Sequence, residues 1–252
     1  LKPNGDDESR ERELELNSAL ALNPILLFPT SLSLNDGRVV HPRQEIFEEA
    51  RRRHPEKELN IPSYYQFATL DKRTLDILSA LRHNTKNKHL SLAEILDKYI
   101  YVEELIYSNA QGRGIANVDD MAQLKTYVRS FTLSPEDVSL LNNHLQGKFM
   151  FKYEGPLLSS NRGLLHIHDA FGPRGSNGPS ETDYKPLLML LGSGKVTLEA
   201  TQASVDNCTV MTTNLDEMEG LEKQLTSSKL LDRIEKIPVN FFLDAHSEMC
   251  IL

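Results

Sequence analysis

The sequence has few of the residues that mark several classes of protein. Its 252 residues include no Trp and only two cysteines, Cys208 and Cys250. Two unpatterned cysteines are too few for a disulfide framework or a Cys-based zinc site, and they indicate a reducing, cytoplasmic compartment. Each lies beside apolar residues in the chain, so we expect both to pack as small hydrophobic side chains.

Positive charge is also scarce. Lys and Arg total 28 against 36 Asp and Glu, which gives a formal net charge of −8. A protein that coats nucleic acid carries a basic surplus, so the composition argues against nucleic acid as a partner. The one basic run is Arg51, Arg52 and Arg53. We expect a solvated helix face there, with contact to a nucleotide phosphate or a protein partner as the alternative.

Long hydrophobic runs are missing as well. The longest cover residues 25–28, 187–191 and, interrupted by Asn240, 239–243, whereas a membrane helix needs about 20 consecutive apolar residues. Residues 1–16 form a charge run, not a signal peptide, and we expect a frayed or solvated helix there. The chain begins with Leu1, which favours a fragment of a longer protein.

The length of the chain suits one large domain or two small ones, at about 150 residues per domain. In the first part, residues 25–28 read as a short strand between two prolines. Helices are predicted over 44–53, 71–107, 119–132 and from 135 to near 147. Two of the starts are well marked. Ser91 and Glu94 form a capping box, and Ser134 followed by Pro135 is a typical N-cap and first helical position.

The second part of the chain has a different pattern. Short apolar segments alternate with helical ones, and a Gly- and Pro-rich loop covers 172–178. This alternation predicts an α/β fold with a parallel sheet. Strands are expected at 164–169, 196–199, 209–213 and 234–242, a helix at 217–228, and a helix or strand at 186–191.

One segment imitates a phosphate-binding loop. Gly192, Ser193, Gly194 and Lys195 match the end of the pattern GxxxxGK[ST]. The full pattern needs a Gly five residues before Gly194, where Met189 stands, and a Ser or Thr after the Lys, where Val196 stands. We therefore predict a tight turn at this segment.

Two histidines are candidates for metal binding. His166 and His168 are two residues apart on a predicted strand, which places them on one face, and this spacing occurs in zinc hydrolases. A third ligand could come from His144, His246 or one of the acids. If the strand stays regular, Asp169 points to the opposite face.

Polar residues also border the predicted strands in an order that suits a nucleotide site. Asp169 ends one strand, Asn214 follows the next, and Arg233 precedes a third. An acid can bind the metal ion, an amide can orient water, and an arginine can neutralise phosphate charge. A capping Asn and a salt-bridged Arg are the ordinary structural alternatives.

The chain resembles the AAA+ module of the PrkA-type bacterial serine protein kinases. The resemblance is carried by GPLLSSNRGLLHIHDAF at 155–171, KPLL at 185–188, the strand ending in Asn at 209–214 and KLLDRI at 229–234. These blocks keep the order and rough spacing of the family over 155–239. Residues 20–150 match it only loosely, mainly at 23–29.

The resemblance implies a role for each residue of that site. Asp169 corresponds to the Walker B acid that coordinates Mg²⁺, and Asn214 to the sensor residue that positions water. Arg233 corresponds to an arginine finger that reaches the ATP of a neighbouring subunit. The implied cofactors are ATP and Mg²⁺, and the implied assembly is a homo-oligomeric ring acting on a protein substrate.

The sequence departs from the family at three points. Ala170 stands where active AAA+ proteins carry a second acid, and the loop at 172–184 is longer than the family's. The phosphate-binding loop is absent and would fall before Leu1, within roughly a hundred residues. The family's C-terminal segment, associated with kinase activity, would fall after Leu252.

These observations predict an AAA+-like parallel sheet with flanking helices and a helical insertion, forming an incomplete P-loop NTPase core. The expected parts are a charged segment at 1–16, the first part of the core at 17–40, a mainly helical insertion or subdomain at 41–150, and the rest of the core at 151–252. Two other functions stay open. One is a degenerate, non-catalytic AAA+-like scaffold or regulator, and the other is a metal-dependent hydrolase using His166 and His168.

Overall fold

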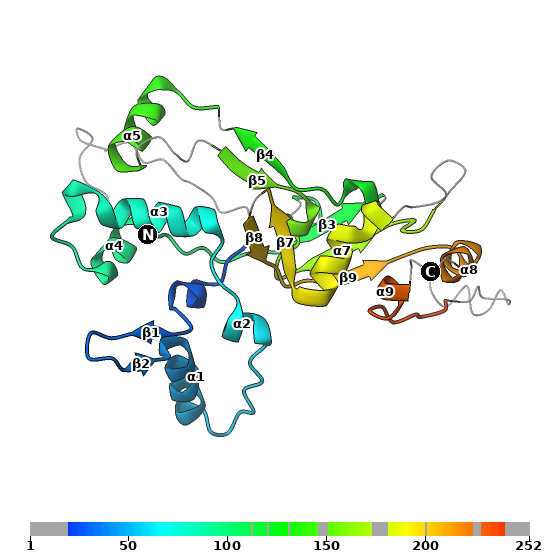
Figure 1. Cartoon of the computed structure of the whole chain (residues 1–252), viewed down its shortest axis with the longest axis horizontal. Coiled ribbons are helices and arrows are strands. Elements are labelled where there is room, and N and C mark those ends of the chain that lie inside the picture. Colours follow the sequence, from blue (N-terminus) through cyan, green and yellow to red (C-terminus); the bar gives the residue numbers. More distant parts are fainter. Residues whose placement is uncertain are drawn as a thin grey trace.

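The computed structural model of the protein describes residues 20–111, 113–119, 121–130, 132–145, 151–172, 181–199, 201–223 and 228–239. Within them the protein is mixed α/β, and it is drawn out along one axis (Figure 1). In Figure 1 the small N-terminal unit lies below the group of helices at one end of the molecule, the central parallel sheet lies beside them, and α8 and α9 lie toward the other end. The predicted segment 1–16 lies outside the described residues.

The N-terminal unit begins with a 3-10 helix, η1 (Pro24–Leu27), and not with the predicted strand. The side chain of Asn23 accepts a hydrogen bond from the Ile25 amide at 3.0 Å, and Pro24 occupies the first helical position. Both features favour a helical turn over an extended chain. The strands β1 (Leu32–Ser33) and β2 (Val39–Val40) then pair antiparallel.

Arg43 holds this unit together from within α1 (Pro42–Arg53). Its side chain is buried, and its guanidinium donates to the carbonyl of Phe28 at 2.6 and 3.0 Å and to that of Ala68 at 2.7 Å. Ala68 follows α2 (Ser63–Phe67). The arginine thus ties α1 to two segments that share a small apolar cluster, formed by Leu26, Tyr64 and Ala68.

The helical group contains α3 (Lys72–His83), the 3-10 helix η2 (Thr85–Asn87), α4 (Leu92–Tyr99) and α5 (Pro135–Leu145). The helical region predicted over 71–107 is confirmed as far as Tyr99, with a break at Asn84 and a new helix after Ser91, whereas residues 100–107 have no regular structure. Both predicted starts are confirmed, since Ser91 and Ser134 each cap their helix. A separate apolar cluster of Leu81, Ile95, Leu141 and Leu145 packs these helices together.

The helix predicted over 119–132 is also wrong. The chain forms a short 3-10 helix, η3 (Met121–Gln123), and then β4 (Tyr127–Ser130). This strand pairs antiparallel with β5 (Phe151–Glu154). The pairing is between residues more than twenty positions apart in the sequence, and such long-range contacts routinely override local propensity.

The centre of the fold is a three-stranded parallel sheet in the order β3 (Ile115–Val118), β6 (Leu164–Ile167) and β9 (Cys208–Met211). The predicted α/β fold with a parallel sheet is confirmed to this extent. The strand β3 comes from the segment that was expected to be mainly helical, so the sheet draws on both 41–150 and 151–252. One face of the sheet enters the largest apolar cluster through Ala116, Val118, Leu165 and Ile167.

The helices α6 (Pro156–Ser159) and α7 (Glu181–Ser193) contribute Leu157, Leu158, Tyr184 and Leu187 to that cluster. Between α7 and β7 (Lys195–Leu198) the chain turns at Gly194, which has φ +61°. This confirms the tight turn predicted for 192–195. A second strand, β8 (Thr201–Ser204), was not predicted and pairs antiparallel with β7.

The predicted strand at 209–213 is confirmed as β9. The helix predicted over 217–228 consists of α8 (Leu215–Glu222) and α9 (Ser228–Leu231), with 224–227 outside the described residues. Residues 234–239 have no regular structure, so the expected strand at 234–242 is wrong over that part. None of the helices in the described ranges is long and apolar enough to span a membrane.

Candidate functional site

Asp169 lies just beyond the carboxyl end of the central strand. The parallel ladder continues past β6, since the His168 amide donates to Val118 at 2.8 Å and the Thr212 amide donates to Ile167 at 3.0 Å. At Asp169 the backbone turns with φ +44°, a left-handed conformation that Asp and Asn adopt more readily than other non-glycine residues. The regular strand therefore ends before Asp169, which leaves its side chain 58% exposed at the edge of the sheet.

Two hydrophobic residues fix this turn. Ala170 and Phe171 are buried in the main cluster, and the Ala170 amide donates to the Thr212 carbonyl at 2.9 Å. Thr212 directly follows β9. The end of β6 is thus tied to the end of β9, and the segments that carry Asp169 and Asn214 meet at one edge.

Asn214 occupies the start of α8. Its backbone amide donates to the Glu217 carboxylate at 3.3 Å, and the Thr213 hydroxyl donates to the same carboxylate oxygen at 2.7 Å. The ordinary structural alternative, an Asn at a helix N-cap, is therefore present in the structure. It is compatible with a functional role, because the cap also holds the residue at the carboxyl edge of the sheet.

Glu217 is a site residue that sequence reasoning missed. A Cβ atom on Gly172 would lie 3.6 Å from Glu217 Oε1 and 3.7 Å from Asp169 Cβ, so the two acids border the same point. The available signal was the spacing, since a Glu three residues after an N-cap Asn reaches back toward the first turn. That spacing places a second carboxylate beside the Asp169 turn.

The contacts that the structure shows for Arg233 are with α9 and α7. Arg233 follows α9, and its guanidinium donates to the Lys229 carbonyl and packs against Gly192 near the end of α7. No hydrogen bond or ion pair within the described part of the chain joins it to Asp169 or Asn214. The expectation that Arg233 precedes a strand is wrong, because the residues after it are not extended into a sheet.

His166 and His168 share one face, as their spacing predicts. Their rings lie 6.1 Å apart in an edge-to-face arrangement, and His166 Nε2 lies 3.4 Å from the Thr212 hydroxyl. Across the described ranges, no three His, Cys, Asp or Glu side chains gather as a metal centre would require. His144 lies on α5, against the Tyr99 ring, and His246 is outside the described residues.

Two smaller predictions have opposite outcomes. The solvated helix face is confirmed, since Arg52 and Arg53 are exposed on α1 and pair with Glu49 at 3.1 and 2.8 Å. The packing expected for the cysteines is wrong for Cys208, which is exposed on β9. Cys250 lies outside the described residues.

The arrangement can hold a divalent cation at one edge of the sheet. An exposed carboxylate at Asp169, the Glu217 carboxylate and the Asn214 side-chain oxygen are the ligand types that Mg²⁺ accepts, together with water and phosphate oxygens. Ligands bind at this end of parallel strands in open α/β sheets. No family model, curated protein or solved structure matches the chain.

Proposed function

We propose that the chain is part of the ATP-binding AAA+ module of a PrkA-like serine protein kinase or ATPase. The observation that carries the proposal is the meeting of Asp169 and Asn214 beyond the carboxyl ends of two adjacent parallel strands, β6 and β9. Strand ends of this kind bring together residues distant in sequence at the place where α/β sheets bind phosphate-bearing ligands. The segments that place both residues are also those that resemble the family.

The residues at this edge have distinct chemical tasks in the proposed site. Asp169 would hold Mg²⁺, which when bound would screen the phosphate charge of ATP. Asn214 orients the attacking water through its side-chain amide. The Asp169 side chain is 58% exposed beside the buried Ala170 and Phe171, and His168 Nδ1 lies 3.4 Å from its carboxylate, so a ligand can reach the acid from solvent.

In the proposed site, Glu217 takes the role of the second acid that is missing at position 170. Ala170 is buried and has no proton-accepting group, whereas the Glu217 carboxylate borders the Asp169 turn from α8. In the proposed mechanism Glu217 accepts the proton of the water that Asn214 orients. Its hydrogen bonds from Thr213 and Asn214 hold the carboxylate in place for this transfer.

Arg233 acts in trans in this proposal. Its side chain is exposed and is not bonded to the Asp169 edge in its own chain. An arginine finger has to be presented to a neighbouring subunit, so the protein would work as a homo-oligomeric ring in the cytoplasm, without nucleic acid as a partner. The protein substrate is defined by parts of the molecule other than this edge.

The test is ATP turnover by the full-length product of the gene. Asp169→Asn should abolish Mg²⁺-dependent turnover, and the change is structurally conservative because Asn also adopts the left-handed conformation. Glu217→Gln should lower turnover by roughly 10²- to 10⁴-fold while ATP still binds, since Gln retains an acceptor for the helix cap. Arg233→Ala should lower turnover by about 10³-fold or more.

A matched control is available on α4. Asp97 is exposed and distant in sequence from the site, so Asp97→Asn should leave turnover unchanged. Rates equal to wild type in Asp169→Asn and Glu217→Gln would show that the residues are misassigned. If the unaltered protein neither binds nor hydrolyses ATP, the alternative function, a non-catalytic AAA+-like scaffold, is favoured. The alanine at position 170 is the sequence feature that supports this alternative.

A further inference from the structure

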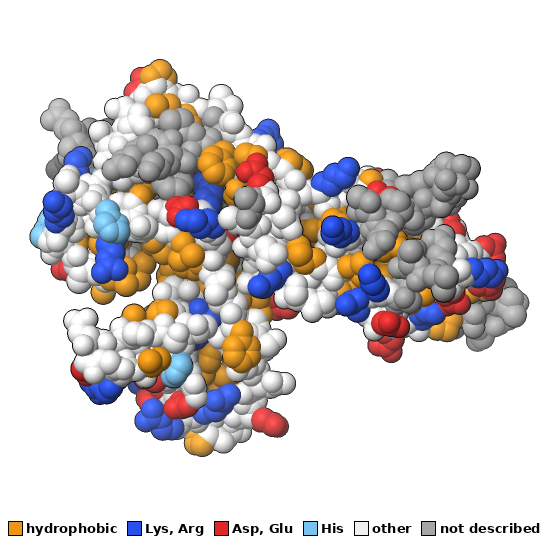
Figure 2. All heavy atoms as spheres, viewed as in Figure 1, with side chains coloured by type: hydrophobic (Ala, Val, Ile, Leu, Met, Phe, Trp, Pro, Cys, Tyr) orange, Lys and Arg blue, Asp and Glu red, His pale blue; other side chains and the backbone are white. Residues whose placement is uncertain are grey.

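The end of the molecule that carries α3 and α4, opposite to α8 and α9, concentrates positive charge (Figure 1). Residues 77–93 contain no Asp or Glu, although the whole chain has a formal charge of −8. Their basic side chains are all exposed: Arg82, His83, Lys86, Lys88 and His89. Figure 2 shows Lys, Arg and His side chains gathered at this end of the helical group. We call residues 82–89 the basic turn.

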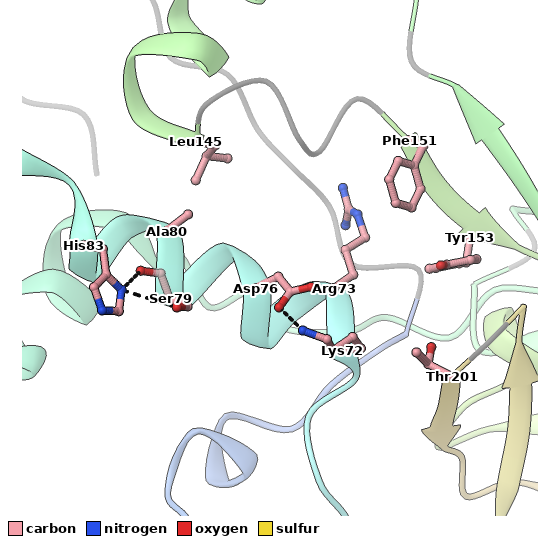
Figure 3. A pocket seen from close by; sticks show the side chains of 10 residues that line it. All are labelled: Lys72, Arg73, Asp76, Ser79, Ala80, His83, Leu145, Phe151, Tyr153 and Thr201. Atoms are coloured by element: carbon pink, nitrogen blue, oxygen red, sulfur yellow. Dashed lines mark hydrogen bonds and ion pairs between the residues drawn. The ribbon is translucent and has the colours of Figure 1, made fainter.

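The cations of the basic turn are not neutralised by neighbouring acids. At the start of α3, Lys72 pairs with Asp76 (Figure 3). In the part of the chain that the structure describes, no such ion pair involves Arg82, Lys86 or Lys88. Arg82 lies in the last turn of α3, where a cation stabilises the helix dipole, but the two lysines lie beyond that helix. Their charge is therefore available to a partner.

Two asparagines hold the backbone of the basic turn in place. The Asn84 side chain donates to two carbonyls at the end of α5, at 3.0 and 3.2 Å. Asn87 is 1% exposed, donates to the Leu81 carbonyl at 2.9 Å and accepts from the Tyr99 hydroxyl at 3.0 Å. The turn is thus fixed to α3, α4 and α5 while its cations stay exposed. A surface that is already ordered loses less entropy when a partner binds.

The segment that follows α4, residues 100–107, has the opposite character. Glu103 and Glu104 are exposed, and within the described residues neither forms an ion pair. Tyr101 is 81% exposed and Ile106 is 70% exposed, in a stretch without regular structure. Neighbouring apolar side chains left in water mark a surface that contacts another molecule. We call residues 100–107 the acidic segment.

The helix α4 separates the basic turn from the acidic segment. The turn precedes its first residue and the segment follows its last, and eight helical residues span about 12 Å. No ion pair joins the two within one chain. A two-fold axis across α4 would bring the basic turn of each copy against the acidic segment of the other. Such self-complementary contacts, in which each copy supplies both halves, form the commonest class of protein dimer.

We propose that this end of the molecule is the interface of a two-fold dimer. Lys86 and Lys88 of each copy would pair with Glu103 and Glu104 of the other copy. The exposed apolar side chains of the acidic segment would be buried against the start of α4, where Leu92 is 52% exposed. A second copy fits better than an unrelated acidic protein, because one chain carries both charges in the order that a two-fold axis matches.

The interface lies away from α8, so it leaves the Asp169 edge free (Figure 1). It is also distinct from the contact that Arg233 would make in a ring, and the dimer does not depend on the proposed nucleotide site. Two subunits joined in this way would link one ring to another, or would pair single chains when no nucleotide is bound.

The test is sedimentation equilibrium of the whole chain without nucleotide, at low ionic strength because salt screens surface charge. The wild type should give twice the monomer mass, which is 28.5 kDa for these 252 residues. Lys88→Glu should raise the dissociation constant of the dimer by at least about tenfold, since it sets like charges against each other at two places. Glu104→Lys should do the same. The chain with both changes should return to within about threefold of the wild type, because the charges match again.

The matched control is Lys57→Glu, the same change at an exposed lysine of the N-terminal unit, which should leave the dimer unaltered. A wild-type monomer, an assembly whose mass and affinity do not change in Lys88→Glu, or a doubly changed chain that stays monomeric would overturn the proposal. The last result would point to an acidic protein as the partner of the basic turn. Asp169→Asn should leave the dimer intact, so failure of the ATP site and failure of this interface are separate results.

Discussion

Replacing Arg43 by Met tests how the N-terminal unit is held together. Arg43 is 2% exposed. Besides its short hydrogen bonds to Phe28 and Ala68, its guanidinium donates to the carbonyls of Tyr65, Gln66 and Leu26 at 3.3–3.5 Å. Met preserves most of the apolar stem but leaves these acceptors without their donor. The apolar cluster beside them is small, so repacking offers little compensation.

The size of the effect follows from the two short contacts. A hydrogen bond to a charged group contributes about 1.5–3 kcal/mol, so the Phe28 and Ala68 carbonyls together account for about 3–6 kcal/mol. Removing a buried cation also relieves its desolvation, which offsets part of the loss. We therefore expect the free energy of unfolding to fall by about 3 kcal/mol. A Lys at position 43 keeps the charge but not the fork of donors, and should lose somewhat less.

The assay is urea denaturation followed by circular dichroism, with the midpoint and slope fitted separately. The control is Arg51→Met, an exposed arginine on the same helix. Surface substitutions of this kind change stability by no more than about 0.5 kcal/mol. If Arg43→Met falls in that same small range, the arginine does not hold the unit and the reasoning is refuted.

Three further predictions concern other parts of the fold. Hydrogen bonds from the Ser91 side chain and then from its backbone lower the pKa of Glu94. The carboxylate therefore stabilises α4 above its ordinary pKa, and this stabilisation is lost as the pH falls through the lowered value. Glu94→Gln should lower the melting temperature more at pH 7 than at acidic pH. Gly163→Ala should destabilise the sheet markedly in a thermal melt, because its Cβ would overlap the Gly114 carbonyl oxygen. Asn161 is buried, accepts from the Asp206 amide at 2.9 Å and donates to the Ala21 carbonyl at 3.3 Å; Asn161→Ala should cost about 1–3 kcal/mol in urea denaturation, and a cost near zero would mean that water replaces the amide.

Local signals were the part of the fold that the sequence could predict. The caps at Ser91 and Ser134 depend on residues within three positions, so the sequence contains the whole interaction. The turn at Gly194 is predictable for the same reason. By contrast, β4 exists because it pairs with β5, and a segment that reads as an amphipathic helix became a strand through that distant partner.

In the candidate site, too, the local features could be predicted from the sequence and the long-range contacts could not. The end of β6 at Asp169 and the end of β9 near Asn214 could be read from apolar runs that stop at a polar residue. That the two ends meet depends on the parallel pairing of β6 with β9, which the sequence only indicated through a general α/β pattern. Glu217 was missed because its importance comes from proximity to Gly172 across the edge, and Arg233 was misplaced because a strand was expected after it.

The most direct test of the Asp169 edge is ATP affinity of the full-length protein, measured by calorimetry with and without Mg²⁺. We predict that Mg²⁺ tightens ATP binding in the wild type and in Asp97→Asn, and that this dependence disappears in Asp169→Asn while the protein stays folded. An equal response to Mg²⁺ in all three proteins would contradict the assignment of Asp169 and with it the proposed nucleotide site.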